Sequence, residues 1–261
     1  MSGIKLYYEI HGKGQPIVFI AGFSVDHNAW MSVVQEFAKT HQVIVFDNRG
    51  VGRSDCPDYH YTSKMMIEDV ITLMQKLKID SAHFVGSSFG GCIAQEIAYK
   101  HPKLVKSIVL VNSIYKISPR LKLQVELRLK FMQANVPEEI IVEDGCVWLF
   151  SNNFLSKTKE IKKLIKCSLA NPCPTTEVGY KNQLAALLSF DSSKWMHKIK
   201  MPCLVITADD DLLVDVEQSE RLAATIPNSE YYCFKGVGHV PFVEEPKLFS
   251  KVVLDFIVRN E

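Results

Sequence analysis

The segment that decides how this chain folds is His83-Phe84-Val85-Gly86-Ser87-Ser88-Phe89-Gly90-Gly91. It begins with a short apolar run typical of a buried strand and continues into a stretch with helical composition. Between the two, residues 86–90 match G-x-S-x-G, which places a serine on a sharp turn from a strand into a helix. Such a turn strains the backbone and projects the hydroxyl outward. Ser88 is therefore the candidate nucleophile.

Similar apolar runs recur along the chain, with helical stretches between them. Runs rich in β-branched residues suit strands buried on both faces of a parallel sheet, and they occupy residues 17–20, 43–46, 108–111 and 204–206. Apolar spacing predicts helices over 63–78, capped by Thr62 or Ser63, and over 89–100. The alternation predicts an α/β fold. Residues 4–10 are expected to form an antiparallel hairpin at the sheet edge.

The alternation stops near residue 115 and resumes near residue 201. Between these points the helical pattern covers residues 120–133, 138–150, 156–169 and 176–190. The sequence thus predicts a core made of residues 1–115 and 196–261, with a helical insertion of residues 116–195 lying over the sheet. An apolar stripe between Leu248 and Ile257 predicts a further helix near the end of the core.

Charge and cysteine content narrow the class of protein. Among 261 residues, 30 Lys and Arg stand against 29 Asp and Glu, a balance that argues against a nucleic-acid binder. No apolar run approaches the roughly 18 residues that a membrane span needs, and the first residues do not resemble a signal peptide. Seven cysteines without a C-x-x-C pair argue against a disulfide framework or a zinc site. We expect a cytoplasmic protein without a bound metal.

A serine hydroxyl is a weak nucleophile and needs a base that is itself oriented by an acid. A strand-like run ends in Asp209-Asp210-Asp211, and His239 follows another such run at residues 231–234. The resulting chain order is serine, aspartate, histidine, which differs from the orders of the chymotrypsin and subtilisin arrangements. The three aspartates, and more weakly Asp215, are the candidate acids.

Four motifs together resemble the α/β-hydrolase family with a helical cap, over nearly the whole chain. Residues 20–23 resemble the family's oxyanion turn, and residues 47–54 resemble its D-x-R-G-x-G-x-S signature. Residues 86–90 resemble its nucleophile elbow, and residues 238–241 its histidine loop. Two residues depart from the family's pattern: Ala21 stands where a histidine is usual, and Ala208 where a glycine is usual. Neither change removes a group that performs chemistry.

The resemblance implies a role for each matching position. Ser88 would be the nucleophile, His239 the base and Asp211 the acid, because the family pattern G-x-x-D selects the third aspartate. The backbone N–H groups of Phe23 and Phe89 would form the oxyanion hole. The candidate substrate pocket comprises Gly22, Ser87, His27, Trp148, Phe150 and Val240, although His27 also suits an ordinary loop position. The segment around Asp47 and Arg49 is interpreted as a structural turn.

The expected activity is hydrolysis of a small-molecule ester, lactone or thioester, without an organic cofactor. The chain is most similar to 3-oxoadipate enol-lactonases and small carboxylesterases. Alternatives are a pimeloyl-acyl-carrier-protein methyl ester esterase, a carbon–carbon bond hydrolase, a perhydrolase and a small-molecule receptor that retains the triad. Lysines at 157, 159, 162, 163 and 166 could bind an acidic acyl carrier protein, or form only a solvated helix face.

Overall fold

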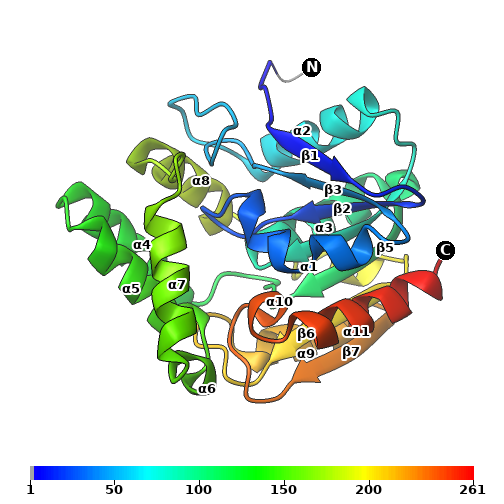
Figure 1. Ribbon diagram of the computed structural model, residues 1–261. Coiled ribbons are helices and arrows are strands. Elements are labelled where there is room, and N and C mark those ends of the chain that lie inside the picture. Colours follow the sequence, from blue (N-terminus) through cyan, green and yellow to red (C-terminus); the bar gives the residue numbers. More distant parts are fainter. Residues whose placement is uncertain (1–2) are drawn as a thin grey trace.

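A computed structural model describes residues 3–261 and contains one seven-stranded sheet (Figure 1). The strand order is β1-β3-β2-β4-β5-β6-β7, with β1 antiparallel to its neighbour and every other pair parallel. The strands are β1 Tyr8–His11, β2 Pro16–Ile20, β3 Gln42–Phe46, β4 Ala82–Ser87, β5 Val105–Val111, β6 Cys203–Ala208 and β7 Ser229–Phe234. The predicted α/β fold with a mostly parallel sheet is confirmed.

Helices cover both faces of the sheet because successive strand residues point to opposite sides. In β2, Ile17 and Phe19 join the apolar cluster under α1 (Met31–Phe37) and α11 (Pro246–Val258). Val18 and Ile20 join the cluster on the other face, under α2 (Ser63–Lys76), α3 (Phe89–Lys100) and α9 (Val216–Thr225). Short helices of the core are η1 His27–Trp30, η2 Pro102–Leu104, η3 Met196–Lys198 and α10 Pro241–Glu244.

The predicted helices agree closely with those of the structure. The helix expected over 89–100 has these bounds, and α2 is capped by Thr62, whose side chain accepts a hydrogen bond from the Met65 N–H. Between β5 and β6 lie α4 Pro119–Gln133, α5 Glu138–Leu149, α6 Asn152–Leu155, α7 Thr158–Leu169 and α8 Glu177–Leu188. These helices form a cap beside the sheet, on the left of Figure 1. The short helix α6 was not expected.

The first strand is antiparallel and lies at the sheet edge as predicted, but the predicted hairpin is wrong. β1 pairs with β3, with Tyr8 opposite Phe46, and it does not pair with the following strand β2. The reason is the strand order: β2 has β3 on one side and β4 on the other, so neither of its edges is free. β1 therefore adds to the exposed edge of β3. No helix within residues 3–261 is long and apolar enough to cross a membrane.

Candidate active site

Ser88 lies at the turn between β4 and α3, in a backbone conformation that L-residues rarely adopt. Its φ is 51° and its ψ is −117°. The Ser88 N–H donates to the carbonyl oxygen of Val111 at 2.8 Å, which fastens the turn to β5. The Ser88 side chain forms no capping hydrogen bond with α3 and is half-buried. Its hydroxyl is therefore not used to stabilise the helix on which it sits.

The glycines on either side of Ser88 allow this turn because backbone passes directly over them. A Cβ atom on Gly90 would lie 2.1 Å from the Ile20 carbonyl oxygen, and one on Gly86 would lie 2.4 Å from the Gly90 carbonyl oxygen. Real Cβ atoms do not approach backbone so closely, so any side chain at either position would displace the turn. The glycine spacing of the motif is thus a packing requirement of this fold.

His239 follows β7 and forms a hydrogen bond with only one of the candidate aspartates, Asp211. The His239 Nδ1 atom is 2.7 Å from Asp211 Oδ2, and both side chains are buried. The other carboxylate oxygen, Oδ1, accepts the backbone N–H groups of Leu213 at 2.8 Å and Val214 at 3.0 Å. A charged acceptor at Nδ1 favours the tautomer with its proton on Nδ1, which leaves Nε2 able to take a proton.

The other three aspartates have different partners. Asp209 accepts the Gly236 N–H and Asp215 pairs with Arg120. Asp210 accepts the N–H of Asn152, the first residue of α6, at 3.1 Å, and so connects the core to the cap. These contacts stabilise loops and leave Asp211 as the carboxylate that orients His239.

Ser88, Asp211 and His239 lie at the same end of the sheet. The reason is that β4, β6 and β7 are parallel and each of the three residues follows the carboxyl end of its strand. Asn112, directly after β5, holds the loop that carries His239, and it was not predicted from the sequence. Its Nδ2 atom donates to the His239 carbonyl oxygen at 2.8 Å, and its φ is 44°. Ser113 donates from Oγ to the Ser88 carbonyl oxygen at 2.8 Å. The sequence signal that could have identified Asn112 and Ser113 is their position as two polar residues directly after a buried strand.

The turn after β2, which carries the predicted oxyanion donor Phe23, lies against Ser88. A Cβ built on Gly22 would lie 3.5 Å from Ser88 Cβ, which is ordinary van der Waals contact. The missing family histidine at position 21 is compensated by other groups. Asn48 Nδ2 donates to the Ala21 carbonyl oxygen at 3.3 Å, and the Ser24 N–H donates to Gln183 Oε1 at 2.9 Å. Phe89, the other predicted donor, is the first residue of α3, where N–H groups lack helical partners.

The histidine loop is held by the cap and by a buried carboxylate, Glu244, which was not predicted from the sequence either. The His239 N–H donates to the Leu149 carbonyl oxygen at 2.9 Å. Glu244 Oε1 accepts the N–H groups of Gly238 at 3.0 Å and Ser151 at 2.9 Å, and Oε2 accepts the Ser151 hydroxyl at 2.6 Å. Glu244 thereby joins the histidine loop to the cap.

His27 is buried in a network of carboxylates. Its Nδ1 atom lies 2.6 Å from Asp47 Oδ1, and its Nε2 atom lies 3.4 Å from Glu9 Oε1. The hydrogen bond to Asp47 is the main reason why the pKa of His27 is raised above its ordinary value. Asp47 also accepts the N–H groups of His27 and Arg53, so the D-x-R-G-x-G-x-S segment forms a hydrogen-bonded turn.

The raised pKa of His27 predicts a pH-dependent contribution to stability. The contribution is complete below the pKa of an unfolded histidine, about 6.5, and is lost as pH rises through the raised folded value. The difference in unfolding free energy between wild type and His27→Gln should therefore be larger at about pH 5.5 than at about pH 8.5. Urea unfolding measures it, with the exposed His60→Gln as the control. If the difference in unfolding free energy between wild type and His27→Gln is constant or grows with pH, the pKa of His27 is not raised in the folded protein.

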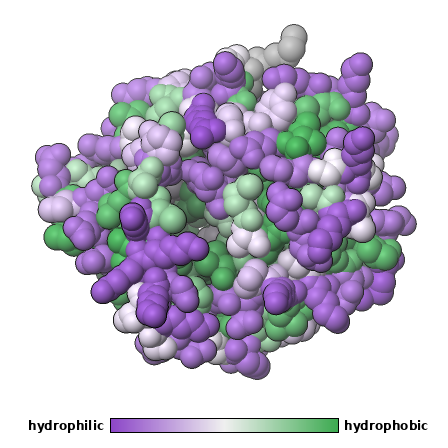
Figure 2. Space-filling view, viewed as in Figure 1, coloured by the Kyte–Doolittle hydropathy of each residue, from purple (hydrophilic) through white to green (hydrophobic). Residues whose placement is uncertain are grey.

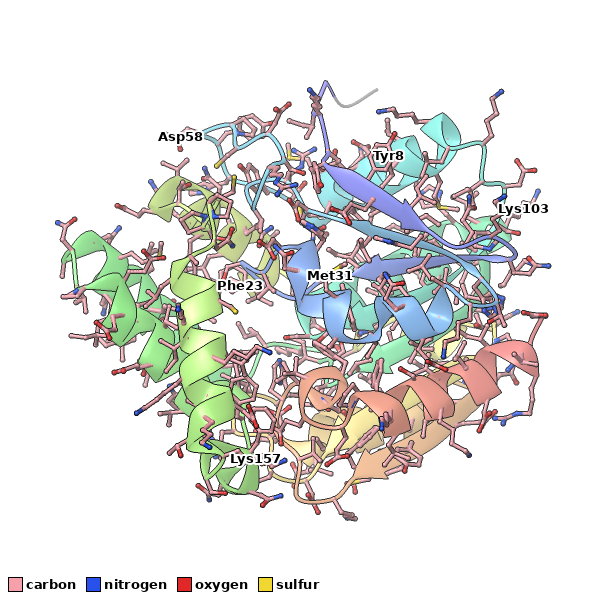
Figure 3. The ribbon with its side chains drawn as sticks, viewed as in Figure 1. Tyr8, Phe23, Met31, Asp58, Lys103 and Lys157 are labelled. Atoms are coloured by element: carbon pink, nitrogen blue, oxygen red, sulfur yellow. The ribbon has the colours of Figure 1, made fainter. Side chains whose placement is uncertain are left out.

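The remaining predicted pocket residues lie partly in the cap. Phe150 is buried and stacks on Phe154 with ring centroids 5.0 Å apart, and Val240 packs against the same cluster. Trp148 is half-buried and Ser87 is buried in β4. Phe23 lies at the junction of cap and core (Figure 3). The face drawn in Figure 2 is hollowed at this junction, where apolar side chains are visible in the recess.

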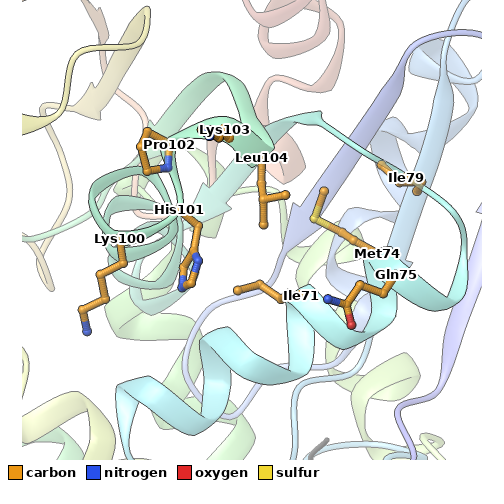
Figure 4. Close-up of a pocket in the computed structure, with 9 residues that line it drawn as sticks. All are labelled: Ile71, Met74, Gln75, Ile79, Lys100, His101, Pro102, Lys103 and Leu104. Carbon is orange, nitrogen blue, oxygen red and sulfur yellow. The ribbon is translucent and has the colours of Figure 1, made fainter.

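A separate cavity of about 560 Å³ lies between α2 and the end of α3 (Figure 4). Its lining includes the apolar Ile71, Met74 and Leu104 and the basic Lys100 and Lys103. The 12 residues of α3 separate it from Ser88 by roughly 18 Å at 1.5 Å per residue. This cavity is therefore at the opposite end of the helix from the candidate active site.

Family comparison agrees with the architecture. Residues 15–246 match the family described as alpha/beta hydrolase fold, and the chain belongs to that family. A relative from Caulobacter sp. (strain K31), provisionally named carbamate hydrolase RutD, is 30% identical over 97% of this chain and 95% of its own.

Two solved structures are similar over nearly the whole chain. The enol-lactonase from Burkholderia xenovorans LB400 is 26% identical with a TM-score of 0.89, covering 98% of both chains. Est816, described as an N-acyl homoserine lactone degrading enzyme, is 28% identical with a TM-score of 0.85 and the same coverage. Together with the family match, these relatives identify the chain as a hydrolase.

Proposed function

We propose that this hydrolase cleaves a carboxylic ester or lactone of a small molecule through an acyl-enzyme formed on Ser88. The observation that carries the proposal is the juxtaposition at one sheet edge of two features. One is a strained serine whose hydroxyl does not cap its helix. The other is a buried histidine whose Nδ1 lies 2.7 Å from a carboxylate that two backbone N–H groups hold in place.

In the proposed mechanism, Ser88 Oγ attacks the substrate carbonyl carbon while its proton passes to His239 Nε2. Asp211 stabilises the resulting imidazolium through Nδ1–H. The carbonyl oxygen becomes an oxyanion that accepts hydrogen bonds from the Phe23 and Phe89 N–H groups, each worth about 3 kcal/mol in typical oxyanion holes. The tetrahedral intermediate then collapses: the bond to the leaving-group oxygen breaks, and His239 protonates that oxygen.

Water then hydrolyses the acyl-enzyme, with His239 moving protons in the opposite direction to the first step. His239 takes a proton from water, whose oxygen attacks the acyl carbon, and Ser88 Oγ leaves with the proton returned from His239. In a lactone the leaving oxygen remains tethered to the acyl group, so one hydroxy acid is the product. Lactones are favoured because two similar solved structures are those of an enol-lactonase and of an N-acyl homoserine lactone degrading enzyme.

The relative named as a carbamate hydrolase supports a second candidate function. A carbamate presents the same carbonyl to Ser88, but its nitrogen lone pair makes the carbon less electrophilic, so the oxyanion donors and the proton from His239 become more important. The same residues would act in the same order, with an amine or an alcohol as the leaving group.

An acyl carrier protein as partner remains a proposal based on the exposed lysines of the cap. Lys157 and the α7 lysines are all exposed, and purple side chains lie over α7 in Figure 2. Lys162 and Lys166 line a groove of about 510 Å³ together with Glu139 and Glu143 of α5. These acidic groups offset part of the positive charge, which weakens the attraction for an acidic carrier.

The test is a substrate panel of p-nitrophenyl esters of increasing acyl length, five- and six-membered lactones and a p-nitrophenyl carbamate. We expect kcat/KM to be highest for lactones or short esters and to fall with acyl length, with no turnover by Ser88→Ala. Highest kcat/KM for the carbamate would favour the second function, and highest kcat/KM for long acyl esters would favour a carrier-linked substrate. If the folded wild type turns over no substrate through Ser88, the proposed function is wrong.

A further inference from the structure

Ser24, next to the predicted oxyanion donor, is held by side chains of the cap rather than of the core. Its φ is 57°, in the left-handed region that favours glycine. Its N–H donates to Gln183 Oε1 at 2.9 Å, and its carbonyl oxygen accepts from Thr175 Oγ1 at 2.8 Å. A residue in an unfavourable conformation persists only where its surroundings hold it. The two cap side chains supply that constraint.

Gln183 is completely buried, and both ends of its amide are used. Nε2 donates to the Arg49 carbonyl oxygen at 2.9 Å, while Oε1 faces the Ser24 N–H. Since the Ser24 group is a donor and the Arg49 group is an acceptor, only one orientation of the amide satisfies both. The side chain therefore bridges two core loops that follow β2 and β3.

Helix α8 presents Gln183 to the turn in a narrowly defined position. Tyr180 lies three residues earlier on the same helix face, and its ring contacts Phe23 with centroids 4.6 Å apart. At Gly179, an added Cβ would lie 1.9 Å from the Gly50 carbonyl oxygen, so the helix packs directly on core backbone. These contacts restrict sliding of α8 along the turn, and with it movement of the Gln183 amide.

We propose that Gln183 is a positioning residue that sets the direction of the Phe23 N–H. The inference rests on the proposed function, in which that N–H stabilises the oxyanion. Ser24 N–H belongs to the peptide group between residues 23 and 24, and Phe23 N–H belongs to the preceding one. Both peptide groups meet at the Phe23 Cα, so fixing the first restricts rotation of the second. Gln183 thus performs the bracing that the family's usual histidine, here Ala21, cannot provide.

The test compares Gln183→Met with Asn182→Leu, which removes a neighbouring buried amide from the same helix. Asn182 Nδ2 donates to Asp58 Oδ1 at 3.1 Å, outside the turn formed by residues 22–26. For the best ester or lactone, we expect Gln183→Met to lower kcat by about 10- to 100-fold with little change in KM, because an oxyanion donor acts in the transition state. Asn182→Leu should change kcat by less than about threefold.

Two further readouts separate positioning from loss of stability. The inhibition constant of a trifluoromethyl ketone, whose adduct with serine carries an oxyanion, should rise in proportion to the loss of kcat/KM. Amide hydrogen exchange at residues 22–26 should become faster in Gln183→Met and stay unchanged in Asn182→Leu. Equal kcat losses in the two variants, a loss confined to KM, or unchanged exchange would overturn the positioning role.

Failure of the proposed function gives a different pattern. If the folded wild type shows no Ser88-dependent turnover, the oxyanion role of the turn is refuted along with the mechanism, whatever the exchange rates show. If wild type is active and Gln183→Met matches it in kcat and in ketone inhibition, only the positioning role is refuted.

Discussion

Ser88→Ala protein is expected to lose on the order of 10⁶-fold in kcat toward esters and lactones while keeping its fold, a loss typical of removing a triad serine. The alanine has no oxygen to attack the carbonyl, so no acyl-enzyme can form. The fold should survive because the Ser88 side chain does not cap α3, and because alanine at a φ of 51° is strained about as much as serine.

The measurement combines initial rates with mass spectrometry after treatment with a fluorophosphonate. Wild type should gain the mass of one phosphonyl group on the peptide that contains Ser88, and Ser88→Ala should gain none. Circular dichroism and the thermal midpoint provide the control for folding. Hydrolysis by pure Ser88→Ala at a rate near that of wild type would refute the serine mechanism.

Asp211→Asn is expected to lower kcat by about 10⁴-fold, the typical cost when the histidine of a triad is forced into the wrong tautomer. The new Oδ1 can still accept the Leu213 and Val214 N–H groups, so the loop should keep its shape. The amide nitrogen then faces His239 Nδ1 and donates to it. The single N–H proton of the neutral imidazole must then lie on Nε2. Nε2 therefore has no lone pair with which to accept the proton of Ser88.

Asp210→Asn is the matched control, one residue away with the same change of group. The Asp210 side chain accepts the Asn152 N–H, and an asparagine oxygen can do the same. Its kcat should stay within about tenfold of wild type, in line with a substitution outside the reacting groups. If Asp210→Asn were the more damaging substitution, the acid would have been assigned to the wrong aspartate.

The cap contributes to both loops that the proposed mechanism uses, the loop with His239 and the turn with Phe23. Leu149 accepts the His239 N–H, and Gln183 accepts the Ser24 N–H. Movement of the cap would therefore disturb the base and the oxyanion turn together, in addition to any effect on substrate access. The buried polar groups Glu244 and Gln183 make these connections at the border between cap and core.

Local signals predicted much of the fold because they depend on neighbouring residues. The apolar spacing and the Thr62 cap predicted α2 to within two residues, and the strand-to-helix context predicted the turn at Ser88. The N-terminal hairpin failed because pairing depends on which strand edge is free. That edge is decided by the order of distant strands, which local patterns do not encode.

In the candidate site, too, local sequence patterns were predictive and contacts between distant segments were not. Motif spacing identified Ser88, His239 and a run of three aspartates. Selecting Asp211 required the family pattern, and the structure adds its 2.7 Å contact with His239. No role was predicted for Asn112 or Gln183, because their partners are far away in the sequence: Gln183 is 159 residues from Ser24, and Asn112 is 127 residues from His239. Glu244 was not predicted either, and its contact with Ser151 spans 93 residues.

The sequence alone determined the α/β class, the helical insertion, the turn at Ser88 and the order of serine, aspartate and histidine. These follow from side-chain periodicity and from glycines that tight turns require, both of which are local. The pairing of β1 and the partner of each aspartate emerge from the three-dimensional packing. The same packing decides which cap side chains hold the turn after β2. These pairings depend on hydrogen-bonding the buried polar groups of the folded chain. A buried donor bonds to whichever acceptor the packing brings next to it.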